Sequence, residues 1–343
     1  MRKITALIVS AAALTSCYEP FVKDYDYCSA YFGYQYDMRT FVVGEKESFD
    51  VTVCLGGVMQ NKMNRSVAVK VDNDLVTEDL SKYAPEGTVI EDAFTAYDIF
   101  TGTTPPFGTI FGNYTVTDFR AGKMKVVKAL PSSFYTVEGL AGMTIKEGEH
   151  TAVATVKPTE DFFSNSRCTV PYYALGFRLM AADVDSLVAG KNFEIIVVRC
   201  ENRFYGNWYH GGKSVTKDAA GNVVSTDEYP FSIPQTDDKI YTLTTDGPYS
   251  VTTDKYIQKT GALKLSFDGD SCTISSDAVT LVPDGRTSGF NGAKLLQDRE
   301  LYLNYTVRNE DGGTTEVTDT LYFRNRVRDG VSEWRSEDAE DYN

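Results

Sequence analysis

Histidine and tryptophan are nearly absent from this 343-residue chain, which contains two of each. The histidines, His150 and His210, belong to no H-E-x-x-H zinc motif, and the chain has no G-x-S-x-G nucleophile elbow. His150 follows Glu149 and His210 precedes two glycines, so we expect both in turns. General-base and metal-ligand chemistry depends heavily on histidine. The sequence therefore predicts a protein that is not an enzyme and that needs neither a metal nor a cofactor.

Basic residues are also few, with 34 Lys and Arg against 48 Asp and Glu, which gives a formal net charge of −14. Nucleic-acid binding needs a basic surface and is therefore not expected, nor is attraction to anionic lipid. Carboxylates are so abundant that spacing cannot identify the pair that a glycosidase uses, and no glycosidase signature is recognisable. The oxygen-rich turns at 72–74 and 268–270 lack the spacing of a calcium loop.

Long hydrophobic runs are missing as well. The apolar run at 4–14 is too short for a membrane-spanning helix, which needs about 20 residues. It follows two basic residues and ends in L-T-S-C at 14–17, which is the bacterial lipobox. We therefore expect a lipoprotein signal peptide at 1–16, acylation of Cys17 and a linker at 17–29. Acyl chains would then hold the mature chain to a membrane and restrict its work to the bacterial envelope.

Cysteine is scarce, and its number leaves the pairing open. The chain has six cysteines, of which Cys17 would carry the lipid. The five that remain are an odd number, and their spacing matches neither a disulfide framework nor a zinc site. They are Cys28, Cys54, Cys168, Cys200 and Cys272. Cys54 and Cys272 lie inside strand-like runs, where buried thiols are the simplest interpretation.

Helical periodicity is rare, and short alternating runs bounded by turn residues dominate. Runs such as 49–55, 67–71 and 151–156 alternate apolar and polar residues, which is typical of half-buried strands. About seven such strands over residues 30–200 favour an immunoglobulin-like β-sandwich. One short helix is expected within 73–83.

The stretch 84–123 interrupts this pattern and is too long for an ordinary loop. It is rich in aromatic residues, among them Tyr97, Phe107 and Phe111. We interpret it as an insertion in the sandwich. Two roles remain open: a hydrophobic cluster packed under the sandwich, or an exposed loop whose rings stack on a ligand or partner.

A second set of strands begins after residues 201–202. Asn/Asp/Gly turns at 220–222, 268–270 and 311–313 each separate two alternating runs, which predicts hairpins. About eight antiparallel strands then fit residues 201–335, which favours a small closed or nearly closed barrel. The overall fold class is therefore all-β. The last eight residues, 336–343, form an acidic tail.

The first strand of this barrel carries Gly206-x-Trp208, which resembles the G-x-W signature of lipocalin and calycin barrels. In that signature an arginine of the last strand stacks across the tryptophan and closes the barrel base. Arg324 and Arg326 stand at the matching end of the last predicted strand. The resemblance implies that all four residues are structural.

Aromatic side chains are the candidate glycan-binding residues, because their flat apolar faces suit sugar C–H surfaces while Asn, Asp, Gln or Arg take the hydroxyls. In the insertion they are Tyr97, Phe107 and Phe111. In the barrel loops they are Tyr229, Tyr256 and Trp334, with Phe231, Tyr249 and Phe290 in the same region. For Trp334, packing back on the barrel is the alternative.

Several short motifs resemble the two-domain surface lipoproteins encoded in polysaccharide-utilisation loci of Bacteroidetes. L-P-S-S-F-Y at 130–135, M-T-I-K-E-G-E at 143–149 and V-P-Y at 170–172 are similar to their N-terminal Ig-like domain. D-T-L-Y-F-R-N-R at 319–326 and D-G-V-S-E-W at 329–334 resemble the end of their calycin-like domain. The 84–123 insertion departs from the family pattern.

The resemblance implies a non-catalytic accessory that binds glycan at the cell surface, anchored in outer-membrane lipid by acylated Cys17, beside an importer complex of the same locus. A structural or adhesive surface lipoprotein, such as a fimbrial or partner-binding subunit, is the alternative. A carrier of a small apolar ligand is a further variant, and it would need a wide apolar lumen in the barrel.

Overall fold

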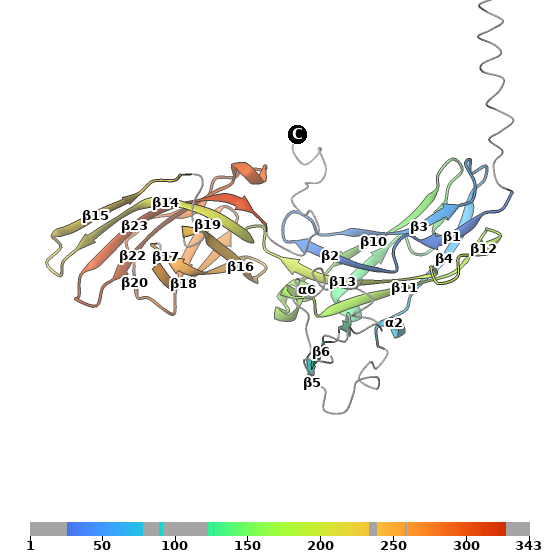
Figure 1. Cartoon of the computed structure of the whole chain (residues 1–343), viewed down its shortest axis with the longest axis horizontal. Coiled ribbons are helices and arrows are strands. Elements are labelled where there is room, and N and C mark those ends of the chain that lie inside the picture. Colours follow the sequence, from blue (N-terminus) through green and yellow to red (C-terminus); the bar gives the residue numbers. More distant parts are fainter. Residues whose placement is uncertain are drawn as a thin grey trace, which may run out of the picture.

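The computed structural model describes residues 26–77, 89–91, 123–125, 127–232, 239–257 and 259–326. Strands are by far the most frequent regular structure among these residues, and helices are few and short, which confirms the all-β fold class. Figure 1 shows two groups of strands, one formed by the first part of the chain and the other by β14 onward. Within these ranges no helix has both the length and the apolar character needed to cross a membrane.

The first group contains two large sheets. The strand order of one is β12 (Ser186–Leu187), β1 (Ser29–Phe32), β3 (Phe49–Gly56), β10 (Thr151–Pro158) and β8 (Tyr135–Glu138). The order of the other is β2 (Tyr36–Val42), β13 (Phe193–Glu201), β11 (Tyr173–Ala182), β4 (Arg65–Val71) and β9 (Thr144–Ile145), with β7 (Lys128–Ala129) also paired to β11. Most pairs are antiparallel, but β1–β12, β2–β13 and β7–β11 are parallel.

Alternation along the strands explains why the two sheets pack face to face. In β3, Phe49, Val51 and Val53 are buried while Asp50 is exposed, and the predicted strand at 49–55 is confirmed. These side chains share one core with residues of β11 and β13 from the other sheet. The second sheet is also covered on its outer face, where α2 (Asp74–Thr77) contributes to a smaller core with β11 and β13. This double burial is why β13 reads as a continuous apolar run.

The predicted helix at 73–83 is described only in its first turn, α2. Of the insertion, the structure describes β5 (Val89–Glu91), which pairs in parallel with β6 (Lys123–Lys125). The shorter elements of this half are helix α6 (Glu160–Ser164) and the 3-10 turns η2 (Ser132–Phe134) and η3 (Ser166–Thr169).

The second group is a closed eight-stranded barrel. Around it run β14 (Gly206–Lys217), β16 (Tyr241–Gly247), β17 (Ser250–Tyr256), β18 (Lys259–Asp268), β19 (Ser271–Ser275), β21 (Ser288–Phe290), β22 (Glu300–Arg308) and β23 (Thr314–Asn325). The barrel closes because β23 pairs with both β22 and β14. Two further strands, β15 (Val223–Tyr229) and β20 (Leu281–Val282), and the 3-10 turn η5 (Leu296–Asp298) complete this half. The three predicted hairpins are confirmed as β14–β15, β18–β19 and β22–β23.

The barrel interior is filled with side chains. Phe204, Trp208, Tyr241, Leu243 and Leu303 are all fully buried in its core. An eight-stranded barrel is just wide enough for its own side chains. The described interior is therefore a packed core, which argues against a carrier of a small apolar ligand.

The two halves are joined through a short, ordered linker at 202–205. The backbone N–H of Asn202 donates to the Thr245 hydroxyl at 3.0 Å, and its side-chain amide donates to the Pro248 carbonyl at 3.0 Å. Because Asn202 is buried and Thr245 lies in β16, these bonds fasten the linker to the barrel wall.

Glu45 makes a second connection. It lies in the turn between β2 and β3, yet its carboxylate accepts from Nη2 of Arg299 at 2.5 Å and lies 3.6 Å from Nη2 of Arg326. Both arginines are buried and belong to the barrel half, and both also donate to the Arg203 carbonyl. One carboxylate of the sandwich thus contacts two guanidinium groups at the base of the barrel. This junction connects the two halves at a second place besides the linker.

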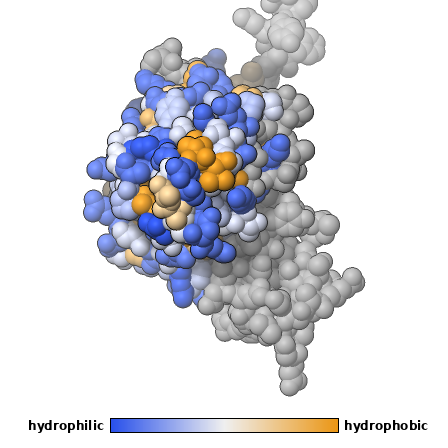
Figure 2. Space-filling view, turned by 90° about the vertical axis from the view of Figure 1, so that its left-hand side faces the viewer, coloured by the Kyte–Doolittle hydropathy of each residue, from blue (hydrophilic) through white to orange (hydrophobic). Residues whose placement is uncertain are grey.

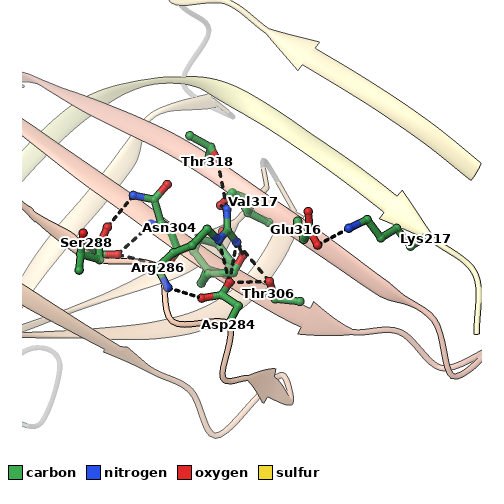
Figure 3. A network of polar contacts seen from close by, with 11 residues as sticks. Lys217, Asp284, Arg286, Ser288, Asn304, Thr306, Glu316, Val317 and Thr318 are labelled. Carbon is green, nitrogen blue, oxygen red and sulfur yellow. Dashed lines mark hydrogen bonds and ion pairs between the residues drawn. The ribbon is translucent and has the colours of Figure 1, made fainter. Parts of the chain in front are cut away.

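The segment between β20 and β21 is fastened to the barrel by Arg286 (Figure 3). Its guanidinium donates to the Val317 carbonyl at 2.9 Å and to the Tyr305 carbonyl at 2.6 Å, and so bridges β22 and β23. Nε donates to Asp284 at 2.9 Å, and the Thr306 hydroxyl donates to the same carboxylate oxygen at 2.6 Å. This arrangement uses the planar fork of arginine, which lysine lacks.

Replacing Arg286 by Lys is expected to lower the free energy of unfolding of the barrel by about 1 to 3 kcal/mol, because a single ammonium cannot bridge both strands and Asp284. Urea denaturation checks this. Arg308→Lys is the matched control, because Arg308 is exposed on the same strand β22 and should tolerate the change. Equal stability of the two variants would contradict the bridging role.

All five cysteines in the described ranges are free thiols. Four are buried, and Cys54 in β3 is half-buried. Burial raises the pKa of Cys272 to about 12 and, with the nearby Glu201 carboxylate, that of Cys200 to about 12. Since the thiolate is the nucleophile, Cys200 and Cys272 are poor nucleophiles at neutral pH.

Candidate functional site

Several of the candidate residues lie outside the described residues. They are Cys17, Tyr97, Phe107, Phe111 and Trp334. Their predicted roles stay predictions.

Tyr229, a predicted glycan-binding residue, lies at the end of β15, and its hydroxyl points into the barrel. It donates to Oδ1 of Asp319 at 2.7 Å, and its ring stacks on His210 with centroids 5.0 Å apart. Burial, followed by the Asp319 carboxylate, raises the pKa of Tyr229 far above its usual range. The hydroxyl of Tyr229 is therefore engaged in a hydrogen bond inside the barrel.

His210 does not lie in a turn, and that expectation is wrong. It occupies the middle of β14, is fully buried and places Nε2 3.1 Å from Oδ2 of Asp319. The two glycines that suggested a turn are needed for close packing. A Cβ at Gly211 would lie 2.9 Å from the backbone N of Phe231, and one at Gly212 would lie 2.5 Å from the Thr318 carbonyl oxygen.

Tyr256, at the end of β17, packs its ring against Gly261 of β18 and the edge of the barrel core. Like Tyr229, it is used by the barrel fold. Neither tyrosine offers a freely exposed ring as a ligand platform.

The residues of the G-x-W signature occupy the base of the barrel. Trp208 is fully buried, its Nε1–H donates to the Phe204 carbonyl at 3.0 Å, and Phe323 packs edge-on at 5.4 Å. Gly206 has φ 137°, and a Cβ there would lie 2.8 Å from the carbonyl oxygen of Asn325. Glycine at this position therefore lets the start of β14 approach the end of β23 closely.

Arg324 and Arg326, two positions apart at the end of the last strand, have different surroundings. Arg326 is buried at the junction with Glu45, and a Cβ on Gly206 would contact its Cγ. The guanidinium carbon of Arg324 lies 5.7 Å from the ring centroid of Tyr209, on the outer side of β14. Arg324 therefore lies on the outer wall of the barrel.

A groove with a volume of about 840 Å³ runs across the outer wall of the barrel beside Arg324. Its lining residues come from β14, β16, β17, β18, the end of β23 and the residue before β16. They are Asn207, Ile240, Thr242, Thr244, Thr252, Thr253, Asp254, Lys255, Ala262, Arg324 and Asn325. Alternation along β16 explains why the groove is polar. Tyr241 and Leu243 point inward, while Thr242 and Thr244, each the next residue along, point outward.

Hydrogen bonds within the groove hold part of its wall in place. The Thr242 hydroxyl donates to Oδ1 of Asn207 at 2.8 Å, and Nδ2 of Asn207 donates to Oδ1 of Asn325 at 3.1 Å. Nζ of Lys255 donates to the Ile240 carbonyl at 2.8 Å. A ligand with many hydroxyl groups would meet donors and acceptors whose orientation is already set.

The groove is lined mainly by hydroxyl and amide side chains, with three charged residues among them. Among its described lining residues there is neither histidine nor cysteine, and Asp254 is the single carboxylate. Glycoside hydrolysis needs two carboxyl groups across the scissile bond. No group of three or more His, Cys, Asp or Glu in the described ranges is arranged to hold a metal ion.

Sequence reasoning missed this groove. The sequence feature that marks the groove is the set of outward threonines of β16 and β17. In the sequence they resemble ordinary solvent-facing strand residues, and only the strand register places them side by side. Thr244 pairs with Thr252, and Asn207 pairs with Thr242. Register of this kind becomes visible only once the barrel is closed.

Comparison with solved structures gives the fold. A Bacteroides ovatus protein of unknown function aligns with a TM-score of 0.58 and 19% identity over 88% of this chain and 95% of its own. An auxiliary nutrient binding protein from Bacteroides thetaiotaomicron aligns with a TM-score of 0.36 and 15% identity over 81% of this chain and 83% of its own. No family model matches the chain. No curated protein sequence matches it either.

Proposed function

We propose that this chain is a non-catalytic cell-surface lipoprotein that binds glycan and assists an outer-membrane polysaccharide-uptake system. The observation that carries the proposal is the polar groove on the outer wall of the barrel. It combines threonine hydroxyls, the amides of Asn207 and Asn325, and the charged groups of Asp254, Lys255 and Arg324. This is the set of donors and acceptors that a neutral, polyhydroxylated ligand requires.

The lipobox ending at Cys17 supports the lipid anchor. The outer membrane and the neighbouring importer follow from the resemblance to the surface lipoproteins. In this proposal the N-terminal sandwich is of immunoglobulin type and separates the anchor from the barrel. The short chain from Cys17 to Asp26 would keep the first described residue within about 30 Å of the anchor.

A structural or partner-binding role is the second candidate, and one observation favours it. In β15, Val223 and Val224 are 60% and 67% exposed, and among the described strands β15 pairs with β14 alone. Figure 2, which looks onto the barrel end of the molecule, shows a hydrophobic patch, with smaller apolar spots near it, on a mostly hydrophilic surface. An exposed apolar edge strand is a site at which another chain can add a strand.

The test is a glycan array probed with the chain from residue 18 onward, followed by calorimetry on the glycans that bind. Asp254→Ala is expected to weaken binding about 10- to 100-fold, because a hydrogen bond to a charged group contributes about 1.5 to 3 kcal/mol. Asp277→Ala is the matched control, because Asp277 is an exposed aspartate outside the groove. A folded chain that binds no glycan would overturn the proposal and favour the partner-binding role.

A further inference from the structure

Three aromatic rings lie together on the outer face of β14 and β23, and we name them the aromatic strip: Tyr209, Phe231 and Tyr322. Phe231 and Tyr322 are stacked, with centroids 4.3 Å apart and planes at 27°. Tyr209 and Phe231 have centroids 5.7 Å apart. Phe231 is 38% exposed, so its ring remains accessible at the surface.

Strand register and one glycine bring the strip together. Tyr209 in β14 is the direct partner of Tyr322 in β23, so both rings stand on the same face of the sheet. Gly211, two residues further along β14, leaves the space in which the backbone of Phe231 lies against the strand. The chain leaving β15 is thereby led across the barrel wall and places its ring on the two tyrosines.

The strip is continuous with the polar groove. Arg324 lines the groove and also places its guanidinium over the ring of Tyr209. Asn207 lines the groove and precedes Tyr209 by two residues on the same outward side of β14, about 6.7 Å away along the strand. A ligand that leaves the groove past Arg324 therefore meets the aromatic strip next.

We propose that the groove and the aromatic strip form one elongated site, which takes several consecutive sugar residues of a polysaccharide chain. The inference rests on the proposed glycan-binding function and specifies its ligand. From β18 through β17, β16 and β14 to β23 the surface crosses four strand spacings, or about 19 Å. A single sugar ring would occupy only part of that length. The groove would take hydroxyl groups, and the strip would stack on apolar sugar faces.

The strip could instead serve the fold alone, by anchoring the chain that leaves β15. The two roles differ in one measurable respect. If the strip is purely structural, a substitution in it changes stability but not the dependence of glycan affinity on ligand length. A strip that contacts ligand affects long oligosaccharides and leaves short ones unchanged.

The experiment uses calorimetry with gluco-, manno-, xylo- and arabino-oligosaccharides of one, two, four and six residues, on the chain from residue 18 onward. In the series that binds, affinity is expected to rise at least tenfold from two to six residues. Phe231→Leu, which keeps an apolar side chain but removes the flat ring, should cancel that rise and leave disaccharide affinity within about twofold. Phe231→Tyr should retain the rise, and melting temperatures of all variants verify folding.

Three outcomes would overturn parts of this picture separately. If the single sugar binds as tightly as the hexasaccharide, the elongated site is wrong while the glycan-binding function stands. If the rise persists in Phe231→Leu, the strip is structural only. If no series and no array glycan binds the folded chain, the proposed function fails and the elongated site fails with it.

Discussion

Replacing Asp319 by Ala is expected to lower the free energy of unfolding of the barrel by about 3 to 5 kcal/mol. Asp319 is buried inside the barrel on β23. Its carboxylate accepts from the hydroxyls of Tyr229 at 2.7 Å and Tyr305 at 3.3 Å, and it faces Nε2 of His210 at 3.1 Å. Alanine would remove the acceptor and leave polar groups buried around a small cavity, which is the costly way to disrupt a buried network.

Urea denaturation followed by Trp208 fluorescence, in a Trp334→Phe background, measures this change at the barrel itself. Asp319→Asn retains the shape and one acceptor oxygen, so its loss should be smaller than that of Asp319→Ala. An exposed carboxylate on the barrel, Asp277, provides the neutral reference as Asp277→Ala. A loss below about 1 kcal/mol for Asp319→Ala would show that the network contributes little to stability.

Glu194 is expected to make the sandwich less stable as the pH rises from about 4.5 to about 8. It is buried in β13, and burial, followed by the nearby Asp37 carboxylate, raises its pKa from 4.5 to about 8. Arg39, which is ion-paired with Asp37 at 2.6 Å, offsets part of this effect. Cys54 of β3 is also nearby, and burial followed by the Glu194 charge raises the pKa of its thiol.

The sign follows from proton binding. Between the two pKa values the native chain holds a proton on Glu194 that the unfolded chain has released, so unfolding releases a proton and becomes easier at higher pH. Across the window the loss of stability is on the order of 4 kcal/mol, and it is complete above pH 8. The pKa of Asp37 is also raised, mainly by burial, and adds a loss of the same sign.

Glu194→Gln should remove most of this slope and make the sandwich more stable than the unchanged chain at pH 8. Denaturant midpoints measured from pH 4.5 to 8.5 check both parts. Glu138→Gln is the control, because Glu138 is exposed beside Lys157 on the surface and should leave the slope as it is. An unchanged slope in Glu194→Gln would assign the pH dependence to other groups.

Local pattern predicts the strands because burial on one face imposes a two-residue period. The runs at 49–55 and 151–156 and the three hairpins of the barrel all follow from it. The same period predicts an inward side chain for His210. It is two residues from the inward Trp208 and therefore points inward as well. The two following glycines suggested a turn because their packing partners, Phe231 and Thr318, are distant in sequence.

The groove and the strip depend on contacts between residues far apart in the chain, and no local signal marks them. Phe231 stacks on Tyr322, and Arg324 lies over Tyr209, only because β23 returns to pair with β14. Tyr229 and Phe231 are two residues apart, and their aromatic character alone does not predict which side of the barrel wall each ring occupies. One ring is drawn into the barrel by Asp319, while the other lies on the outer wall.

Glu45 would have a mechanical consequence if the chain is anchored through Cys17, as proposed. If a polymer bound to the barrel is pulled, the load does not pass through residues 202–205 alone. It is shared by Glu45, whose carboxylate holds Arg299 and Arg326 at once and therefore resists twisting as well as stretching. Tension on the barrel would then reach the sandwich through two connections, the linker and Glu45. Glu45→Ala would leave the same two halves connected by a looser swivel.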